Sequence, residues 1–121
     1  MRRPDPAGQA TVELALVLPV LLAVGVLLAE AGLVVKDYVL VAHAARESVR
    51  AAVVEPTATA AGQAARDTAG LVPDRLGVEL RRRAGLVTVI VSYRRALYVP
   101  FTRRKIREIP LSVQVTGHVE D

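Results

Sequence analysis

The sequence predicts an α+β protein, in which a long N-terminal transmembrane helix continues into a small head with a short helix and an antiparallel sheet of about three strands. Two observations carry this prediction. An almost unbroken apolar run fills residues 14–35, and after residue 75 the spacing of the apolar residues changes from a helical period to a period of two. Of the 121 residues, 52% are hydrophobic, and many of them lie in that one run. The remainder can bury only a modest core.

Residues 14–35 have the length and composition of a membrane span. Glu30 alone interrupts the run, which at 1.5 Å of rise per residue measures about 33 Å, enough to cross the hydrocarbon core of a bilayer. Arg2 and Arg3 precede the span. The positive-inside rule therefore favours a cytoplasmic N-terminus and an extracytoplasmic head, with the protein held in the cytoplasmic membrane.

A cleavable secretory signal is the alternative interpretation of this region. Residues 29–31 read Ala-Glu-Ala, which is an A-x-A site after an apolar stretch. Two features count against it: Asp5 and Glu13 lie in the leading segment, and the apolar run is longer than a usual signal core.

Several residues inside the span are candidates for helix packing. Pro19 removes one backbone donor and permits a bend. Gly25, Ala29 and Gly32 are small and would let a second helix approach closely. Glu30 lies near the outer end of the span, where it is a candidate contact for another helix or subunit.

The helical pattern continues beyond the membrane. Between residues 36 and 54, apolar residues recur at spacings of three and four, at Tyr38, Val41, Ala42, Ala45, Val49, Ala52 and Val53. Polar residues take the other face, at Lys36, Asp37, His43, Arg46, Glu47 and Arg50. The sequence Glu-Pro-Thr at residues 55–57 ends the helix. We therefore expect a membrane helix over residues 9–35, its extracytoplasmic extension over residues 36–54, and a head domain over residues 55–121.

The head is predicted to hold one short helix and three strands. An alanine-rich segment predicts a helix from about Thr59 to Ala69, closed by Gly70 and Pro73. Alternation predicts strands over residues 86–93 and 109–120. A weaker strand over residues 76–82 precedes them and is joined to the first by a turn at Ala84-Gly85. In the second strand one face carries Val87, Val89, Val91 and Tyr93. Such a small sheet needs the cover of a helix to be stable.

The charged residues of the head form three arginine-rich clusters, at residues 81–83, 94–95 and 103–107. We interpret them as solvated strand ends and a loop over residues 98–108, which discourage pairing between sheets. One phenylalanine and three tyrosines accompany them, so a base-stacking platform has little support and nucleic acid is not an expected partner.

The chemistry of an enzyme has little support in this sequence. Cysteine is absent, and the two histidines lie on different predicted elements with no metal-spaced partners. We expect a non-enzyme with no catalytic residue, no metal and no cofactor.

At the start of the apolar run, the sequence GQATVE resembles the processing site of type IV prepilins. The resemblance implies a leader over residues 1–8 that ends at Gly8, cleavage by a prepilin peptidase, and a mature chain that begins at Gln9. It also places Glu13 at the fifth position of the mature chain, where the acid would set the register between packed subunits.

Further blocks narrow the resemblance. VELALVLPVLL from residue 12, EAG at residues 30–32, AARESVRAA at residues 44–52 and the closing VQVTGHVED together resemble the TadE/TadG-like pseudopilins of the tight-adherence (Flp pilus) system. Arg46, Glu47 and Arg50 are expected to form a solvated helix face with a local ion pair at a spacing of three. Together with Glu120 they are also candidate partner contacts.

The expected function is therefore that of a minor pseudopilin or pilus-assembly protein, which acts in pilus initiation or assembly or enters the pilus in small amounts. Its expected partners are the prepilin peptidase, the membrane, and other pilins or TadE/TadG-like pseudopilins that pack on the N-terminal helix. The alternative is an unprocessed single-pass protein whose basic extracytoplasmic head binds anionic envelope components.

Overall fold

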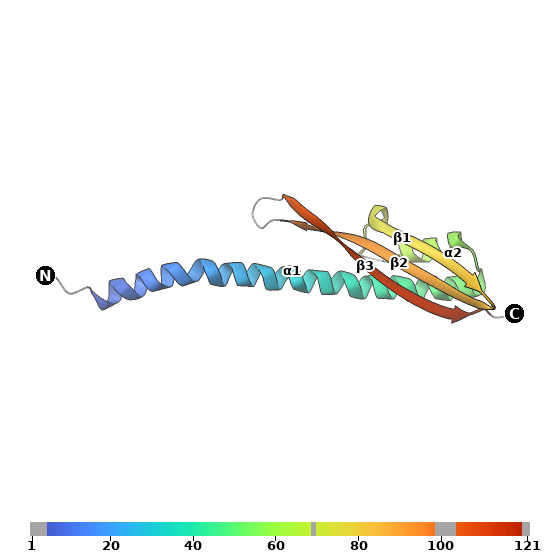
Figure 1. The fold of residues 1–121 in the computed structure, drawn as a ribbon, viewed down its shortest axis with the longest axis horizontal. Helices are drawn as coiled ribbons and strands as arrows, with labels where there is room; N and C mark the ends of the chain where they lie inside the picture. Colours follow the sequence, from blue (N-terminus) through green and yellow to red (C-terminus); the bar gives the residue numbers. More distant parts are fainter. Residues whose placement is uncertain (1–4, 69, 99–103, 120–121) are drawn as a thin grey trace. The chain divides into compact units, whose positions relative to one another are not determined.

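The computed structural model describes residues 5–68, 70–98 and 104–119, and Figure 1 shows the order of the elements along the chain. Two helices come first, α1 (Pro6–Val54) and α2 (Ala58–Arg66), and a 3-10 turn, η1 (Pro73–Arg75), follows them. Three strands complete the chain, β1 (Leu76–Arg83), β2 (Leu86–Tyr98) and β3 (Lys105–His118). A long apolar helix, a short helix and a three-stranded antiparallel sheet confirm the predicted α+β class.

The chain divides into two compact units, residues 1–33 and 34–121. The described part of the first unit is the apolar portion of α1. Asp5 begins this helix, because its side chain accepts a hydrogen bond from the Ala7 N–H (3.1 Å) and its carbonyl accepts one from the Gln9 N–H (3.0 Å). Pro6 follows in the first turn, where a missing N–H costs nothing. Pro19 lies inside the helix without ending it.

The second unit is a two-layer head. Residues 34–54 of α1, together with α2, cover one face of the sheet β1-β2-β3 (Figure 1). α1 ends at Val54, as predicted, because Pro56 disfavours the helical conformation at Glu55. The hydroxyl of Thr57 then accepts a hydrogen bond from the Ala60 N–H (3.1 Å) and caps α2.

The predicted end of α2 is wrong. The helix stops at Arg66, not at Ala69, a residue that lies outside the described part of the chain. The Thr68 N–H bonds to the Ala65 carbonyl three residues back (3.2 Å), which tightens the last turn. Leu71 is buried in the core, so the chain must turn inward before another helical turn can form.

The strands follow the prediction at the first hairpin and exceed it elsewhere. Ala84 and Gly85 both have positive φ (48° and 77°) between the paired residues Arg83 and Leu86, which is the geometry of a two-residue hairpin turn.

Both long strands are longer than predicted. β2 runs to Tyr98, and β3 begins at Lys105, inside the segment expected to be a loop. The ladder continues through Arg95↔Ile109 and Leu97↔Arg107. The hydrogen bonds of this part of the ladder join backbone groups, so they form whatever the side chains are. Because many side chains here are charged, the sequence shows no alternation of apolar and polar residues from which a strand could be predicted.

The core is built from small helical residues packed on valines. Val87, Val89 and Val91 of β2 are fully buried and Tyr93 nearly so, which confirms the predicted inner face. Opposite them, α1 and α2 contribute Val41, Ala44, Ala45, Val49, Ala52, Ala61 and Ala65. Ser48 is also buried, where its hydroxyl donates a hydrogen bond to the Ala61 carbonyl (3.0 Å) and joins the two helices.

Gly117 of β3 allows the sheet to approach α1. A Cβ at this position would lie 2.7 Å from Val49 Cγ1 and 3.0 Å from Val53 Cγ2. Gly117 pairs with Val87 of β2, so the beginning of β2 lies at the level of the last turns of α1.

Two residues near the start of the head exchange their predicted faces. Tyr38 was expected on the apolar face of α1 and is 50% exposed, whereas Asp37 was expected on the solvated face and is 7% exposed. The reason is a partner for Asp37 on the sheet, described below.

Candidate functional site

Gly8 and Gln9, the predicted processing site, lie in the first turns of α1 and are exposed. A Cβ on Gly8 would come no closer to the rest of the chain than 3.9 Å, from Asp5 Cβ, which is ordinary van der Waals contact. The backbone of Gly8 is helical and its φ is not positive. Among the residues that the structure describes, nothing therefore gives a steric reason for a glycine at position 8.

Glu13 lies four residues after Gln9, one helical turn further along α1. The side chain is exposed, and so are its apolar neighbours Val12, Leu14 and Leu16. A carboxylate in this setting is a single charge at the edge of an apolar surface, where it is costly to bury unless another group compensates it.

The apolar surface that begins at Val12 continues to Val35, and most of its large side chains are exposed. α1 is the helix of the described chain that is long and apolar enough to cross a membrane, and none of its most apolar window is buried. A contiguous apolar surface of this length marks a lipid or protein contact. The helix fits a single-pass membrane anchor.

The predicted packing residues of the span leave open surface. A Cβ added to Gly25 or Gly32 would meet nothing within 4 Å, so a second helix could approach closely at both positions. Pro19 and Ala29 are exposed, and Glu30 is half-buried.

The predicted contact residues of the head are only partly brought together. Arg46 and Arg50 are exposed and Glu47 is half-buried on α1. Glu47 lines a shallow hollow between α1 and α2 with His43 and Asp67. Within the described ranges, no three His, Asp or Glu side chains are placed to hold a metal ion. Glu120 lies outside the described residues.

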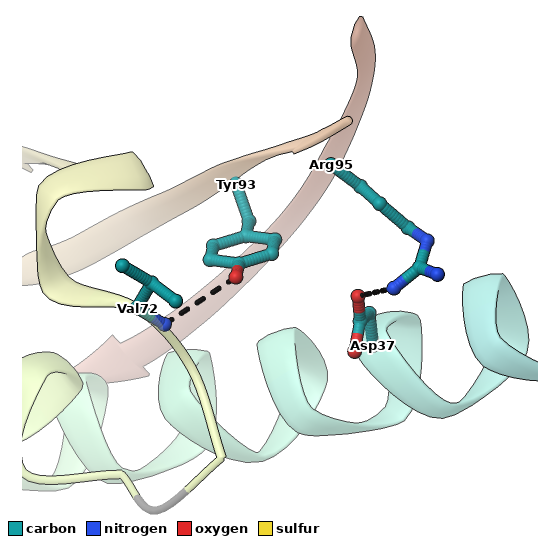
Figure 2. Close-up of polar contacts among 4 residues, drawn as sticks. All are labelled: Asp37, Val72, Tyr93 and Arg95. Atoms are coloured by element: carbon teal, nitrogen blue, oxygen red, sulfur yellow. Dashed lines mark hydrogen bonds and ion pairs between the residues drawn. The ribbon is translucent and has the colours of Figure 1, made fainter. Parts of the chain in front are cut away.

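The sequence interpretation missed an ion pair that joins the start of the head helix to the sheet. Arg95 Nη1 of β2 donates to Asp37 Oδ2 of α1, and the two side chains are 16% and 10% exposed. Figure 2 shows Arg95 reaching from the strand down to Asp37, with Tyr93 beside it. The Tyr93 hydroxyl accepts a hydrogen bond from the Val72 N–H (3.3 Å) and so ties the α2–η1 connection to the same strand.

Arg95 was interpreted as part of a solvated cluster, and that interpretation is wrong for this residue. Two signals in the sequence place the pair inside. Arg95 continues the inward alternation of Val91 and Tyr93 along β2, and Asp37 lies four residues before the buried Val41 on α1. Opposite charges at inward positions of two packed elements predict an ion pair.

One family model matches the chain, that of TadE-like protein, over residues 8–50. This segment is TadE-like. The finding confirms the resemblance stated from the sequence. No curated protein and no solved structure matches the chain.

The TadE-like segment begins at Gly8 and ends at Arg50, so it lies within α1 and crosses from the first unit into the second. The match supports a pilus-associated protein of the Tad type, with the membrane and other pilus components as partners.

Proposed function

We propose that this protein is a minor pseudopilin or pilus-assembly protein of a tight-adherence system, cut after Gly8 by a prepilin peptidase and active in pilus initiation or assembly. One observation carries the proposal: the TadE-like match begins at the glycine of the processing site and continues through the apolar helix. Under this proposal residues 1–8 are the leader and residues 9–35 span the cytoplasmic membrane.

The space around Gly8 supports the proposal that a binding partner, and not the fold, requires glycine at this position. Because no contact among the described residues excludes a side chain there, a requirement for glycine would come from whatever binds this segment. A membrane-embedded peptidase must bring its catalytic groups close to the backbone, and glycine leaves that approach open. To reach the bond after Gly8 in an extended form, the enzyme would open the hydrogen bonds from Ala7 and Gln9 to Asp5.

Cleavage would change the electrostatics of the helix start. It removes Arg2 and Arg3 and leaves a new amino group on Gln9, one helical turn before Glu13. A carboxylate carried into hydrocarbon is costly unless paired. In two helices packed side by side and shifted along their axes, Glu13 of one would pair with the amine of the next, so the acid sets the register of assembly.

The orientation follows from the same residues. Arg2 and Arg3 favour a cytoplasmic N-terminus, and long domains are translocated largely regardless of their charge. The basic head would therefore lie outside the cytoplasmic membrane. Gly25 and Gly32 face open space and would be the points of closest approach to other pseudopilin helices.

Deletion of the gene, with complementation by the wild-type protein, tests the proposed function. We expect the deletion to remove most surface pili, as measured by electron microscopy and by the amount of pilin sheared from cells, and complementation to restore them. The level of the major pilin in total cell extract is the control, because it should not change. Normal piliation in the deletion strain would overturn the assembly role and favour a plain anchored protein.

A further inference from the structure

The direction of β2 fixes which end of the head lies nearest the apolar segment. Val87, near the start of β2, pairs with Gly117, which lies against Val49 and Val53 of α1. Arg95, eight residues further along β2, reaches Asp37. β2 therefore runs antiparallel to the head part of α1, as Figure 1 also shows. The residues after Arg95 lie at the end of the head where Val34 enters.

This end of the β2–β3 hairpin carries a distinct set of side chains, which we call the hairpin tip: residues 94–98 of β2 and 105–108 of β3. Its basic residues Arg94, Lys105 and Arg107 are exposed. Its apolar and aromatic members include Ile106 and Tyr98, which are 64% and 44% exposed. Away from the tip, the inner face of β2 and β3 is apolar and at least partly buried. The combination of exposed basic, aliphatic and aromatic side chains is therefore confined to the tip.

A bulge displays Ile106. Tyr98 pairs with Lys105 and Leu97 with Arg107, so Ile106 is the extra residue of β3 at the register shift. A bulge of this kind bends the strand and re-aims the side chain of the unpaired residue. Here it places a large aliphatic side chain in solvent, in a head whose other aliphatic side chains on β3 are partly or fully buried.

Glu108 moderates the charge of the tip without removing it. Lys105 Nζ donates to Glu108 Oε1, and this bond lowers the pKa of Glu108. Arg94 and Arg107 keep their positive charges in addition. Arg75 of η1 lies beside the tip, where a hydrogen bond with Tyr98 raises the pKa of Arg75.

The tip lies at the same end of the head as Val35, the last residue of the apolar run. The apolar run ends at Val35, about 3 Å of helix before Asp37. β2 continues for three residues beyond Arg95, which is held at the level of Asp37. Exposed arginine and lysine beside an aromatic and an aliphatic side chain are the residues found where proteins meet lipid headgroups.

We propose that the hairpin tip binds the headgroups of anionic lipids beside the point where α1 leaves the membrane. Arg94, Lys105 and Arg107 contact phosphates, and Ile106 and Tyr98 enter the interfacial layer. The Asp37–Arg95 ion pair holds β2 on α1 at this end of the head. This inference needs α1 to be membrane-inserted but does not depend on the pilus role or on cleavage after Gly8.

The test uses the full chain in lipid vesicles. Because the sequence contains no cysteine, an Ile106→Cys variant accepts one polarity-sensitive fluorophore at the tip, and a Gln63→Cys variant on the exposed face of α2 is the matched control. Each is reconstituted in phosphatidylcholine alone and in an equal mixture of phosphatidylcholine and phosphatidylglycerol. We expect the tip probe to shift to the blue, and to be quenched by nitroxide-labelled lipids, only in the anionic vesicles.

Charge reversal supplies the second part of the test. Arg94→Glu with Arg107→Glu should abolish the shift of the tip probe. Arg81→Glu with Arg83→Glu reverses two exposed arginines at the end of β1, beside the start of β2 and away from the tip. This control pair should leave the shift of the tip probe unchanged. High salt should weaken the shift in the unsubstituted protein, because it screens the attraction.

Three results would overturn the inference. The first is a tip probe with the same emission in neutral and anionic vesicles, a comparison that needs no charge substitution. The second is an equal shift of the Gln63 probe. The third is a shift that appears only at high protein density in the vesicles, which would assign the tip to a contact with a second copy of this chain.

Discussion

Replacing Arg95 by alanine is expected to lower the free energy of unfolding of the head by about 2–4 kcal/mol. The substitution leaves the Asp37 side chain, 10% exposed, without the guanidinium that compensates its charge, and removing one member of a buried ion pair costs several kcal/mol. The lower part of that range allows for the water that still reaches the two side chains. Urea-dependent pulse proteolysis of the full chain in detergent, where the arginine-rich head offers many trypsin sites, measures the change.

The neighbouring residue provides the control for this prediction. Arg94 is exposed, so Arg94→Ala should change the free energy of unfolding by no more than about 0.5 kcal/mol. The double variant Asp37→Leu with Arg95→Leu should recover most of the lost stability, because an apolar pair replaces the ion pair at little net cost. An Arg95→Ala protein as stable as Arg94→Ala would show that the ion pair does not hold the sheet on α1.

Replacing Glu13 by alanine is expected to reduce surface pili by more than about tenfold without affecting membrane insertion. If Glu13 pairs with the amino group of Gln9 on a neighbouring subunit, its loss leaves that amine unpaired at the edge of the hydrocarbon, and about 1.4 kcal/mol is enough for a tenfold change in an assembly equilibrium. Carbonate extraction of membranes measures insertion, and immunoblotting of sheared pili measures assembly.

Two further variants make this result specific. Glu13→Asp keeps the charge on a shorter side chain and should retain part of the activity. Glu55→Ala removes an exposed carboxylate just after α1 and should behave as wild type. Full piliation by the Glu13→Ala protein would refute the register role of the acid.

The parts of the fold that sequence predicted correctly are those with a local cause. Pro56 ends α1, the Ala84-Gly85 pair makes a two-residue turn with positive φ, and the alternation in β2 buries Val87, Val89 and Val91. Each depends on residues within one element or at its boundary, so the pattern and its physical reason can both be read along the chain.

The parts that sequence missed depend on contacts between elements. The continuation of β2 and β3 rests on backbone pairing between segments rich in charge. The burial of Asp37 in place of Tyr38 rests on Arg95, 58 residues away along the chain. Asp37 and Arg95 each lie at an inward position of their own element. The ion pair can be predicted only when the two positions are considered together.

The candidate functional residues are of a third kind. Gly8, Glu13, Gly25 and Gly32 are exposed, and among the described residues no contact at the three glycines excludes a larger side chain. The sequence identified them through their resemblance to a processing site and to a helix-packing face. Under the proposed function, the reason for these residues lies in a peptidase, a membrane or a neighbouring subunit.

The mature N-terminus tests the proposed maturation most directly. Intact-mass measurement of the protein from cells with an active prepilin peptidase should give a chain that begins at Gln9, and the same measurement in cells that lack the peptidase should give the full precursor. A Gly8→Leu variant should remain uncut in both. A wild-type chain that keeps residues 1–8 in the presence of the active peptidase would contradict the proposed maturation and favour an unprocessed membrane anchor.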